Sequence, residues 1–352
     1  MPPKKPRPRN PIFVRDAAPF IISAKEEGRQ VFVVISGKVS SLFPELVGAL
    51  EKGGVPVIPW KDGEKNKTAR SKAMLEYELF RAGIDRDSVL AAIGGGTLLD
   101  LAGFTAATLM RGVAWIAVPT TLLAMSDASM GGKTGVNSAC GKNIVGAFHY
   151  PEGVAVWLPF LRTLPAGEKR NGLAECVKHG LIADEGHYLN ALNADLSDER
   201  GVGRLLRDSQ RIKMSFLRKD PFDRNGERTI LNFGHTVGHG LEKLSGYRLS
   251  HGEAVLLGMA WETALSLADG YCDRLAFTQI RKELFAVIGK RAGPRVDASS
   301  LWRCMSADKK RRGKDLFYIP LKQAGEPALP SPYTAPLRFD VFRKSYKLLT
   351  EG

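Results

Sequence analysis

Three histidines gather in one short segment in the second half of the chain. His235 and His239 stand four residues apart, which places both on one face of a helix, and His251 follows in the motif His251-Gly252-Glu253. The whole chain contains 6 His. Neutral imidazole is the commonest ligand of zinc and related metals, and a catalytic site uses three protein ligands and keeps one position open. The segment therefore predicts a divalent-metal site, with ordinary core or surface histidines as the alternative.

A carboxylate on an apolar helical segment adds to this signal. Glu175 lies in Ala174-Glu175-Cys176-Val177, where a carboxylate needs a partner, and a cation is the natural one. We interpret Cys176 as a small buried side chain and not as a nucleophile, because no basic group is assigned to it. A protease of the HExxH type is excluded, because Thr236 occupies the position of its glutamate.

Glycines in the first half of the chain indicate a phosphate-binding turn. Gly94, Gly95 and Gly96 follow an apolar run directly and precede a helical pattern, so the backbone there can approach a phosphate at a helix N-terminus. Asp62-Gly63-Glu64 follows another apolar run, where an acidic side chain can hold the ribose hydroxyls of a dinucleotide. A plain tight turn and an exposed polar turn are the alternatives.

A second glycine motif does not support a nucleotide triphosphate site. Gly131-Gly132-Lys133-Thr134 looks like the end of a P-loop, but the Walker pattern requires glycine where this chain has Asp127. The segment also follows no clear strand. We therefore exclude a P-loop here.

The elements that must position these residues change in type along the chain. Apolar runs at 31–35, 55–60, 88–93 and 113–118 predict strands, and helical spacing occupies 39–50, 68–82 and 98–108. Strands that alternate with helices predict a Rossmann-like parallel sheet. From about residue 165 to 290 the spacing is mostly helical. We predict an α/β fold with an N-terminal Rossmann-like domain over 1–162 and a mainly α-helical domain over 163–352, in which the Pro-rich segment 324–337 wraps the surface.

Composition limits the class of protein. The 352 residues are 44% hydrophobic and 25% charged, which is ordinary for a globular protein. The 4 Cys are scattered and form no zinc or disulfide pattern. We find no apolar stretch long enough for a membrane span, and the first ten residues lead into no signal-peptide core. We therefore expect a cytoplasmic protein without membrane contact.

The net charge of +14 comes partly from two short basic stretches. One is the Pro-rich leader, residues 1–10, and the other is the run 309–314. Basic proteins can bind nucleic acid, but no nucleic-acid-binding motif is present. A basic surface, or a pocket for a multiply charged anion, is the better interpretation, with a non-enzymatic nucleic-acid-binding protein as the alternative from another class.

Several motifs together resemble the 3-dehydroquinate synthase family. They are GGGTLLDLAGFTAATLMRG (94–112), VPTTLLAMSDASMGGKTGVN (118–137), GKNIVGAF (141–148), LAECVKHG (173–180), LNFGHTVGHGLE (231–242) and HGEAV (251–255). The similarity runs in order from about residue 60 to 315. It implies conversion of 3-deoxy-arabino-heptulosonate 7-phosphate into 3-dehydroquinate and phosphate, with NAD that is reduced and reoxidised in each turnover and with a divalent metal, zinc or cobalt.

The resemblance also implies roles for individual residues. The matching metal ligands are Glu175, His235 and His251. The matching NAD contacts are Glu64, Lys67, Gly95, Gly96, Asp100, Thr120, Thr121, Lys142, Thr163, Leu164 and Glu168. The matching substrate residues are Asp127, Lys133, Asn143, Lys178, Lys213, Arg228, Asn232 and His239, together with either Lys309 or Lys310. Arg111 matches an arginine that is donated across a homodimer interface.

The proposed substrate suits this set of residues. A phosphate and a carboxylate on one molecule require a pocket rich in Lys, Arg and Asn. Glu64 repels a 2′-phosphate and so favours NAD over NADP. Sister sugar phosphate cyclases, which make valiolone, amino-dehydroquinate or deoxy-inosose skeletons, are the alternative within the family. Lys213, Arg228 and Asn232 favour the carboxylate-bearing substrate.

Two segments depart from the family pattern. Ser36-Gly37-Lys38 stands where the family often has Asp-x-Asn after the first strand, which predicts weaker binding of the adenosine end of NAD. The segment 219–227 is less acidic than the common version and is one residue longer, which changes one wall of the expected pocket.

Overall fold

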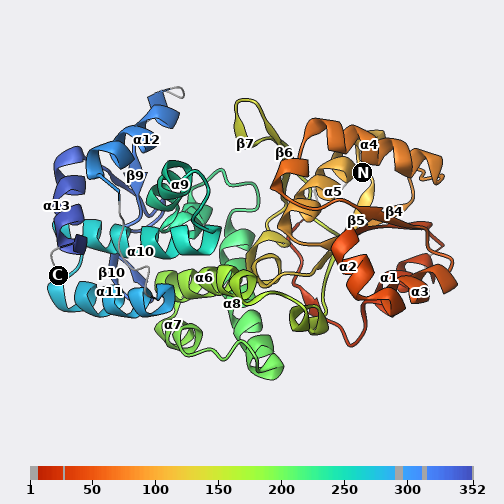
Figure 1. Cartoon of the computed structure of the whole chain (residues 1–352), viewed down its shortest axis with the longest axis horizontal. Coiled ribbons are helices and arrows are strands. Elements are labelled where there is room, and N and C mark those ends of the chain that lie inside the picture. The colour runs from red at the N-terminus through yellow and green to blue at the C-terminus, as the bar shows by residue number, and fades with distance from the viewer. Residues whose placement is uncertain (1–6, 27, 290–295, 311–314, 351–352) are drawn as a thin grey trace. The chain divides into compact units, whose positions relative to one another are not determined.

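The chain forms two compact units, Met1–Lys169 and Arg170–Gly352 (Figure 1). The computed structural model describes residues 7–26, 28–289, 296–310 and 315–350, with residues 26 and 307–310 described as backbone only. The change in sequence pattern predicts a boundary after residue 162, whereas the structure divides the chain after Lys169.

The first unit contains a parallel sheet of six strands in the order β1-β8-β5-β4-β2-β3. The strands are β1 (Ile12–Phe13), β2 (Val31–Ser36), β3 (Val57–Trp60), β4 (Val89–Gly94), β5 (Ala114–Pro119) and β8 (Gly153–Val156). Every residue of β2 and β4 is buried, as expected for parallel strands that are covered by helices on both faces. The predicted Rossmann-like domain is confirmed.

Helices cover both faces of this sheet. They are α1 (Ala17–Glu26), α2 (Gly37–Leu42), α3 (Pro44–Lys52), α4 (Ala69–Arg81) and α5 (Gly96–Thr108). Phe32 and Val34 of β2 belong to one core cluster with Leu75 and Leu79 of α4. Because side chains alternate along a strand, Val33 faces the other way. Figure 1 shows α4 and α5 on one side of the sheet and α1, α2 and α3 on the other.

Part of the predicted secondary structure of this unit was wrong. The expected single helix over 39–50 is divided into α2 and α3 at Phe43, which has φ −130°. Pro44 explains the break, because proline disfavours helical backbone at the residue before it. The sequence also gave no signal for the edge strand β1, for β8, or for an antiparallel hairpin of β6 (Lys133–Ser138) and β7 (Gly141–Phe148).

The second unit is mainly helical, as predicted. Its helices are α6 (Ala166–Ala183, which begins in the first unit), α7 (Glu185–Leu192), α8 (Glu199–Lys219), α9 (His235–Leu244), α10 (His251–Ala268), α11 (Arg274–Ile288), α12 (Ala298–Lys310) and α13 (Phe339–Thr350). Short strands β9 (Phe317–Tyr318), β10 (Leu321–Gln323), β11 (Glu326–Pro327) and β12 (Ala335–Pro336) form two small antiparallel pairs. The Pro-rich segment 324–337 therefore contributes β11 and β12.

Helix α10 forms the core of the second unit. Trp261 is fully buried, stacks on Phe342 of α13 with ring centroids 5.0 Å apart, and donates a hydrogen bond to Ser345 Oγ at 2.9 Å. Against α9, the contact is between backbones. A Cβ on Gly258 of α10 would lie 1.9 Å from the carbonyl oxygen of Gly234, so only glycine fits there.

Among the described residues, no helix combines the length and the hydropathy that crossing a lipid bilayer requires.

A buried histidine in α7 makes the folded state sensitive to acid. His187 is 3% exposed, and neither of its ring nitrogens has a hydrogen-bond partner among the described residues. Burial, assisted by the nearby His179, lowers the pKa of His187 to about 4. The unfolded chain therefore takes up this proton first as the pH falls below about 6.5, and stability is lost between about pH 6.5 and pH 4.

We predict that His187→Leu reduces this loss. Between pH 7 and pH 5 the wild type should lose about 2 kcal/mol of unfolding free energy more than the variant. Urea unfolding of both proteins at the two pH values measures the difference. Equal losses in the two proteins would show that His187 does not titrate as described.

Candidate active site

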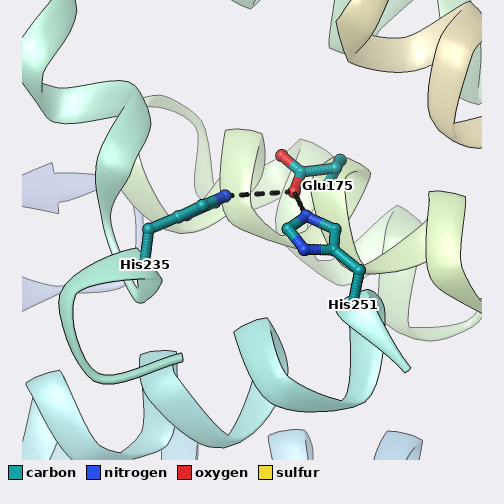
Figure 2. Close-up of side chains that lie close together, drawn as sticks. All are labelled: Glu175, His235 and His251. Atoms are coloured by element: carbon teal, nitrogen blue, oxygen red, sulfur yellow. Dashed lines mark ion pairs between the residues drawn. The ribbon is translucent and has the colours of Figure 1, made fainter. Parts of the chain in front are cut away.

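Three side chains from three helices of the second unit converge on one point (Figure 2). Glu175 comes from α6, and His235 and His251 are the first residues of α9 and α10. His235 Nε2 lies 3.6 Å and His251 Nε2 lies 3.4 Å from Glu175 Oε1. The three ligand atoms lie within 4.8 Å of one another. We call these residues the ligand triad.

Neighbouring groups orient both imidazoles. His235 Nδ1 donates a hydrogen bond to the carbonyl oxygen of Phe233 at 3.1 Å, and His251 Nδ1 lies 3.5 Å from Glu242 Oε1. A carbonyl oxygen and a carboxylate both accept hydrogen bonds, so the Nδ1 atom of each ring carries the proton. The Nε2 atom of each ring then faces Glu175. Outer partners of this kind fix the tautomer of metal-binding histidines.

The ligand triad fits a divalent metal ion. Two ligand atoms that are each about 2.1 Å from zinc at the tetrahedral angle lie about 3.4 Å apart, which agrees with the distances of 3.4 Å and 3.6 Å. Two imidazoles and one carboxylate are also a ligand set that zinc and related metals use. Three protein ligands leave a fourth position open, as in catalytic sites.

Charges around the ligand triad are strongly coupled. Glu175 is 1% exposed and pairs with the ammonium of Lys178, which is 2% exposed. Burial, assisted by Lys178, lowers the pKa of His235 to about 3, so this ring is neutral and ready to bind a metal. Burial also opposes charge on His251, but Glu175 and Glu242 outweigh it and raise its pKa to about 10.

The other residues that the resemblance assigns to substrate binding in this unit differ in exposure. Lys213 of α8 and Arg228 are each 5% exposed, and Arg228 Nη1 donates to the carbonyl oxygen of Pro221 at 3.0 Å. Asn232 and His239 are exposed, and the His239 ring lies 5.2 Å from that of His235. The side chains of Lys309 and Lys310 lie outside the described residues, although their backbone ends α12.

In the first unit, the strand order places the glycine turn at a topological switch point. The chain passes from β2 outward to β3 and then returns to β4 on the other side of β2. Open α/β sheets bind ligands outside the carboxyl ends of the strands at such a point. Gly95 caps α5 there, and a Cβ on it would lie 3.2 Å from Thr121 Cγ2. Thr120 N donates to the carbonyl oxygen of Gly94 at 3.0 Å.

Several predicted cofactor residues of this unit are brought together. Lys67 is 3% exposed, and its ammonium contacts both the carboxylate of Asp100 and the side-chain oxygen of Asn143. Glu64 Oε1 accepts a hydrogen bond from Asn137 Nδ2 at 2.7 Å. Asn143 N also donates to Asn137 Oδ1 at 3.0 Å. Lys67 and residues from η1 (Glu64–Asn66), α5, β6 and β7 therefore form one polar network.

The segment that departs from the family pattern has a partner of its own. Ser36 Oγ donates to the carboxylate of Asp62 and accepts from Val39 N at 3.2 Å. Burial raises the pKa of Asp62, although Ser36 and Lys38 oppose this shift. A carboxylate is thus present at the end of β2, supplied by the segment after β3 (Val57–Trp60).

The remaining predicted residues are distributed over the first unit. Asp127 lies in the π-helical turn η3 (Ala124–Ala128). Lys133 and Lys142 are exposed on the β6–β7 hairpin. Thr163 and Leu164 lie between η4 (Leu158–Arg162) and α6, and Glu168 lies in the first turn of α6. Arg111 ends the short helix η2 (Leu109–Arg111).

Two residues that position the ligand triad were not predicted from the sequence. Glu242, which faces His251, stands three residues after His239, on the same helical face. Metal-binding histidines commonly donate to a carboxylate, so a carboxylate at this spacing could have indicated Glu242. Asn171 Oδ1 accepts a hydrogen bond from Gly252 N at 3.2 Å and so fixes the start of α10. Nothing in the local sequence marks Asn171.

Solved structures share this fold. One is 2-epi-5-epi-valiolone synthase from Streptomyces hygroscopicus with NAD+ and Zn2+ bound, with a TM-score of 0.83, 23% identity and 99% of each chain covered. Another is 2-deoxy-scyllo-inosose synthase complexed with carbaglucose-6-phosphate, NAD+ and Co2+, with a TM-score of 0.82, 24% identity, and 93% of this chain and 94% of that chain covered. At these identities the similarity shows the fold alone.

Curated relatives are more similar in sequence. A 3-dehydroquinate synthase from Pelobacter propionicus is 38% identical over 303 residues, which cover 82% of this chain and 83% of that protein. A 3-dehydroquinate synthase from Pelotomaculum thermopropionicum is 43% identical over 255 residues, 70% of this chain and 68% of that protein. The family models for the 3-dehydroquinate synthase N-terminal and C-terminal domains match residues 57–171 and 172–311. The chain therefore belongs to the 3-dehydroquinate synthase family.

Proposed function

We propose that this chain is a 3-dehydroquinate synthase, which converts 3-deoxy-arabino-heptulosonate 7-phosphate into 3-dehydroquinate and inorganic phosphate. The ligand triad carries this proposal, because its spacing fits a divalent metal with one open position. The relatives at 38% and 43% identity are 3-dehydroquinate synthases. The sister cyclases among the solved structures are only 23–25% identical, which favours the carboxylate-bearing substrate.

We infer that the chain uses NAD and a divalent metal. The sister cyclases of known structure hold NAD+ with Zn2+ or with Co2+. NAD supplies reversible hydride transfer at one carbinol, and the metal supplies positive charge that polarises the carbinol oxygen. The Gly95 turn and the Lys67–Asp100 pair support binding of the cofactor to the first unit.

The protein's own cations match the charge of the substrate. Lys178, Lys213 and Arg228 are all at least 95% buried, and a low-dielectric environment strengthens their attraction for a phosphate or carboxylate. Arg228 can bind oxygen pairs in a planar fork, whereas the lysines act as point charges. His239 is exposed beside the ligand triad, so it can hold or move a proton during the reaction.

The proposed function predicts turnover of the heptulosonate phosphate. Purified protein supplied with NAD and Zn2+ or Co2+ should release inorganic phosphate from 3-deoxy-arabino-heptulosonate 7-phosphate and form 3-dehydroquinate. A coupled phosphate assay together with product chromatography measures both. Turnover of sedoheptulose 7-phosphate or glucose 6-phosphate alone would instead assign the chain to a sister cyclase.

A second prediction concerns the metal. Glu175→Ala, His235→Ala and His251→Ala should each lower metal affinity by more than the roughly 10–100-fold that loss of an outer partner costs, and activity should be lost with the metal. Metal content after dialysis, measured by atomic emission, and phosphate release together check this.

His239→Ala is the matched control, because His239 forms a second possible ligand group with Glu242 and His251. It should retain metal and lose about 10²–10⁴-fold in rate, as expected for a proton-transfer group. If His239→Ala loses metal while Glu175→Ala retains it, the ion binds the second group instead.

We also propose that the active unit is a homodimer in which Arg111 serves the site of the partner subunit. Met110 and Arg111 have φ of 49° and 68°, a left-handed backbone that costs energy for residues other than glycine. Arg111 is exposed. Strained backbone that presents an exposed guanidinium supports a role in binding phosphate oxygens.

The test is complementation between two inactive variants. Arg111→Ala and Lys133→Ala homodimers should each be nearly inactive. Co-expression should restore about a quarter of wild-type activity, because about half of the dimers are mixed and each mixed dimer has one intact site of two. If mixed dimers are demonstrably present without recovery, Arg111 acts in its own subunit or only in the fold.

A further inference from the structure

A buried carboxylate in the second unit has no role in the proposed reaction. Glu262 of α10 is 0% exposed. Its Oε1 accepts a hydrogen bond from Thr236 N at 3.2 Å, and its Oε2 accepts one from Ile319 N at 3.3 Å. Burial raises the pKa of Glu262 to about 8, although the backbone N–H groups of Gly234, Ile319, Val237 and Thr236 oppose this shift. The partners of this carboxylate are thus backbone groups, most of them at the start of α9.

Helix α9 needs such an acceptor because it lacks a cap of its own. The first N–H groups of any helix have no partner within the helix and usually bond to a side chain at the N-cap. The N-cap of α9 is Gly234, which has no side chain to do this. Glu262 therefore takes the place of the N-cap from a neighbouring helix, because its carboxyl oxygen accepts a hydrogen bond from the first turn of α9.

The position of this turn matters because its first residue is the metal ligand His235. The facing helix α10 begins with a second ligand, His251. The two helices touch through glycines: a Cβ on Gly258 would lie 1.9 Å from Gly234 O, and a Cβ on Gly238 would lie 2.9 Å from Ala254 O. Glycine contact sets how closely the helices approach, but it leaves the first turn of α9 free to rotate or fray unless its N–H groups are held.

We propose that Glu262 is a positioning residue for the ligand triad, which holds the first turn of α9 so that His235 Nε2 faces Glu175. The inference rests on the proposed metal site. It assigns Glu262 no contact with substrate, cofactor or metal. Its effect passes through the backbone of residues 234–237 to the imidazole of His235.

Glu262→Gln is the direct test. The amide keeps the shape of the side chain, but its NH2 group faces backbone N–H donors, so at least one of the four donors loses its acceptor. Thr263→Val is the matched control, because Thr263 is equally buried on the same helix. Among the described residues, its hydroxyl donates only to Met259 O, within α10, at 2.8 Å. Metal-free samples of wild type and both variants are titrated with Co2+ by calorimetry and by visible absorption.

We expect Glu262→Gln to bind Co2+ about 10–100-fold more weakly than wild type, the cost of losing an outer partner of a metal ligand. Its Co2+ absorption bands should also change in position or intensity, because the ligand geometry changes. Thr263→Val should bind Co2+ as wild type does, with the same spectrum. Wild-type affinity and spectrum in a folded Glu262→Gln protein would overturn the inference.

If Glu262→Gln does not fold, Glu262→Asp replaces it. Aspartate keeps the carboxyl group but is one methylene shorter, so we expect weaker Co2+ binding and a changed spectrum. A wild-type spectrum and affinity would again overturn the proposal. Failure of the proposed function has a different result: wild type and His235→Ala then bind Co2+ equally, which removes the metal site and this inference with it.

Discussion

The burial of one carboxylate organises the second unit. An ionised group taken out of water costs several kcal/mol unless opposite charge and hydrogen bonds compensate, and Glu175 is 1% exposed. Side chains from three helices pair with it: Lys178 of α6, His235 of α9 and His251 of α10. Both histidines are the first residues of their helices, so two positive helix ends also meet at this carboxylate. The N–H groups at each helix start also need hydrogen-bond acceptors. Glu262 provides one for α9, and the Ser250–Glu253 capping box provides them for α10.

In the first unit, the main structural requirement is that the backbone can come close to a phosphate. Its sheet is covered on both faces, so only the strand ends are accessible for binding. Gly95 at the end of β4 removes the side chain that would block approach to α5. On the helix that follows this turn, Asp100 pairs with the ammonium of the buried Lys67. Each unit thus holds a buried ammonium group against a carboxylate. The pair is Lys67 with Asp100 in the first unit and Lys178 with Glu175 in the second.

Elements and sites that depend on a local residue pattern could be predicted from the sequence. Those that depend on residues far apart in the chain could not. β2 and β4 are continuous apolar runs and could be predicted, whereas β1 has only two residues and is too short to give a signal. The spacing of His235 and His239 alone made both equal candidates for the metal, and the family resemblance selected Glu175, His235 and His251. The structure places Glu175 Oε1 3.6 Å from His235 Nε2 and 3.4 Å from His251 Nε2. Glu262 resembles Glu175 as a carboxylate on an apolar helix. Its partners are backbone N–H groups, which no residue type reveals.

The glycine contact between α9 and α10 has a consequence for how this part of the molecule can be engineered. Since a Cβ on Gly258 would collide with Gly234 O, neither helix can be exchanged for one from an unrelated bundle, whatever its own helix propensity. The paired helices α9 and α10 carry both imidazoles and the supporting Glu262 carboxyl group. A designer who wished to move these two metal ligands into another scaffold would have to graft α9 and α10 as a pair. The recipient would then supply the Glu175 carboxylate and the partners that Asn171 and Ile319 provide here.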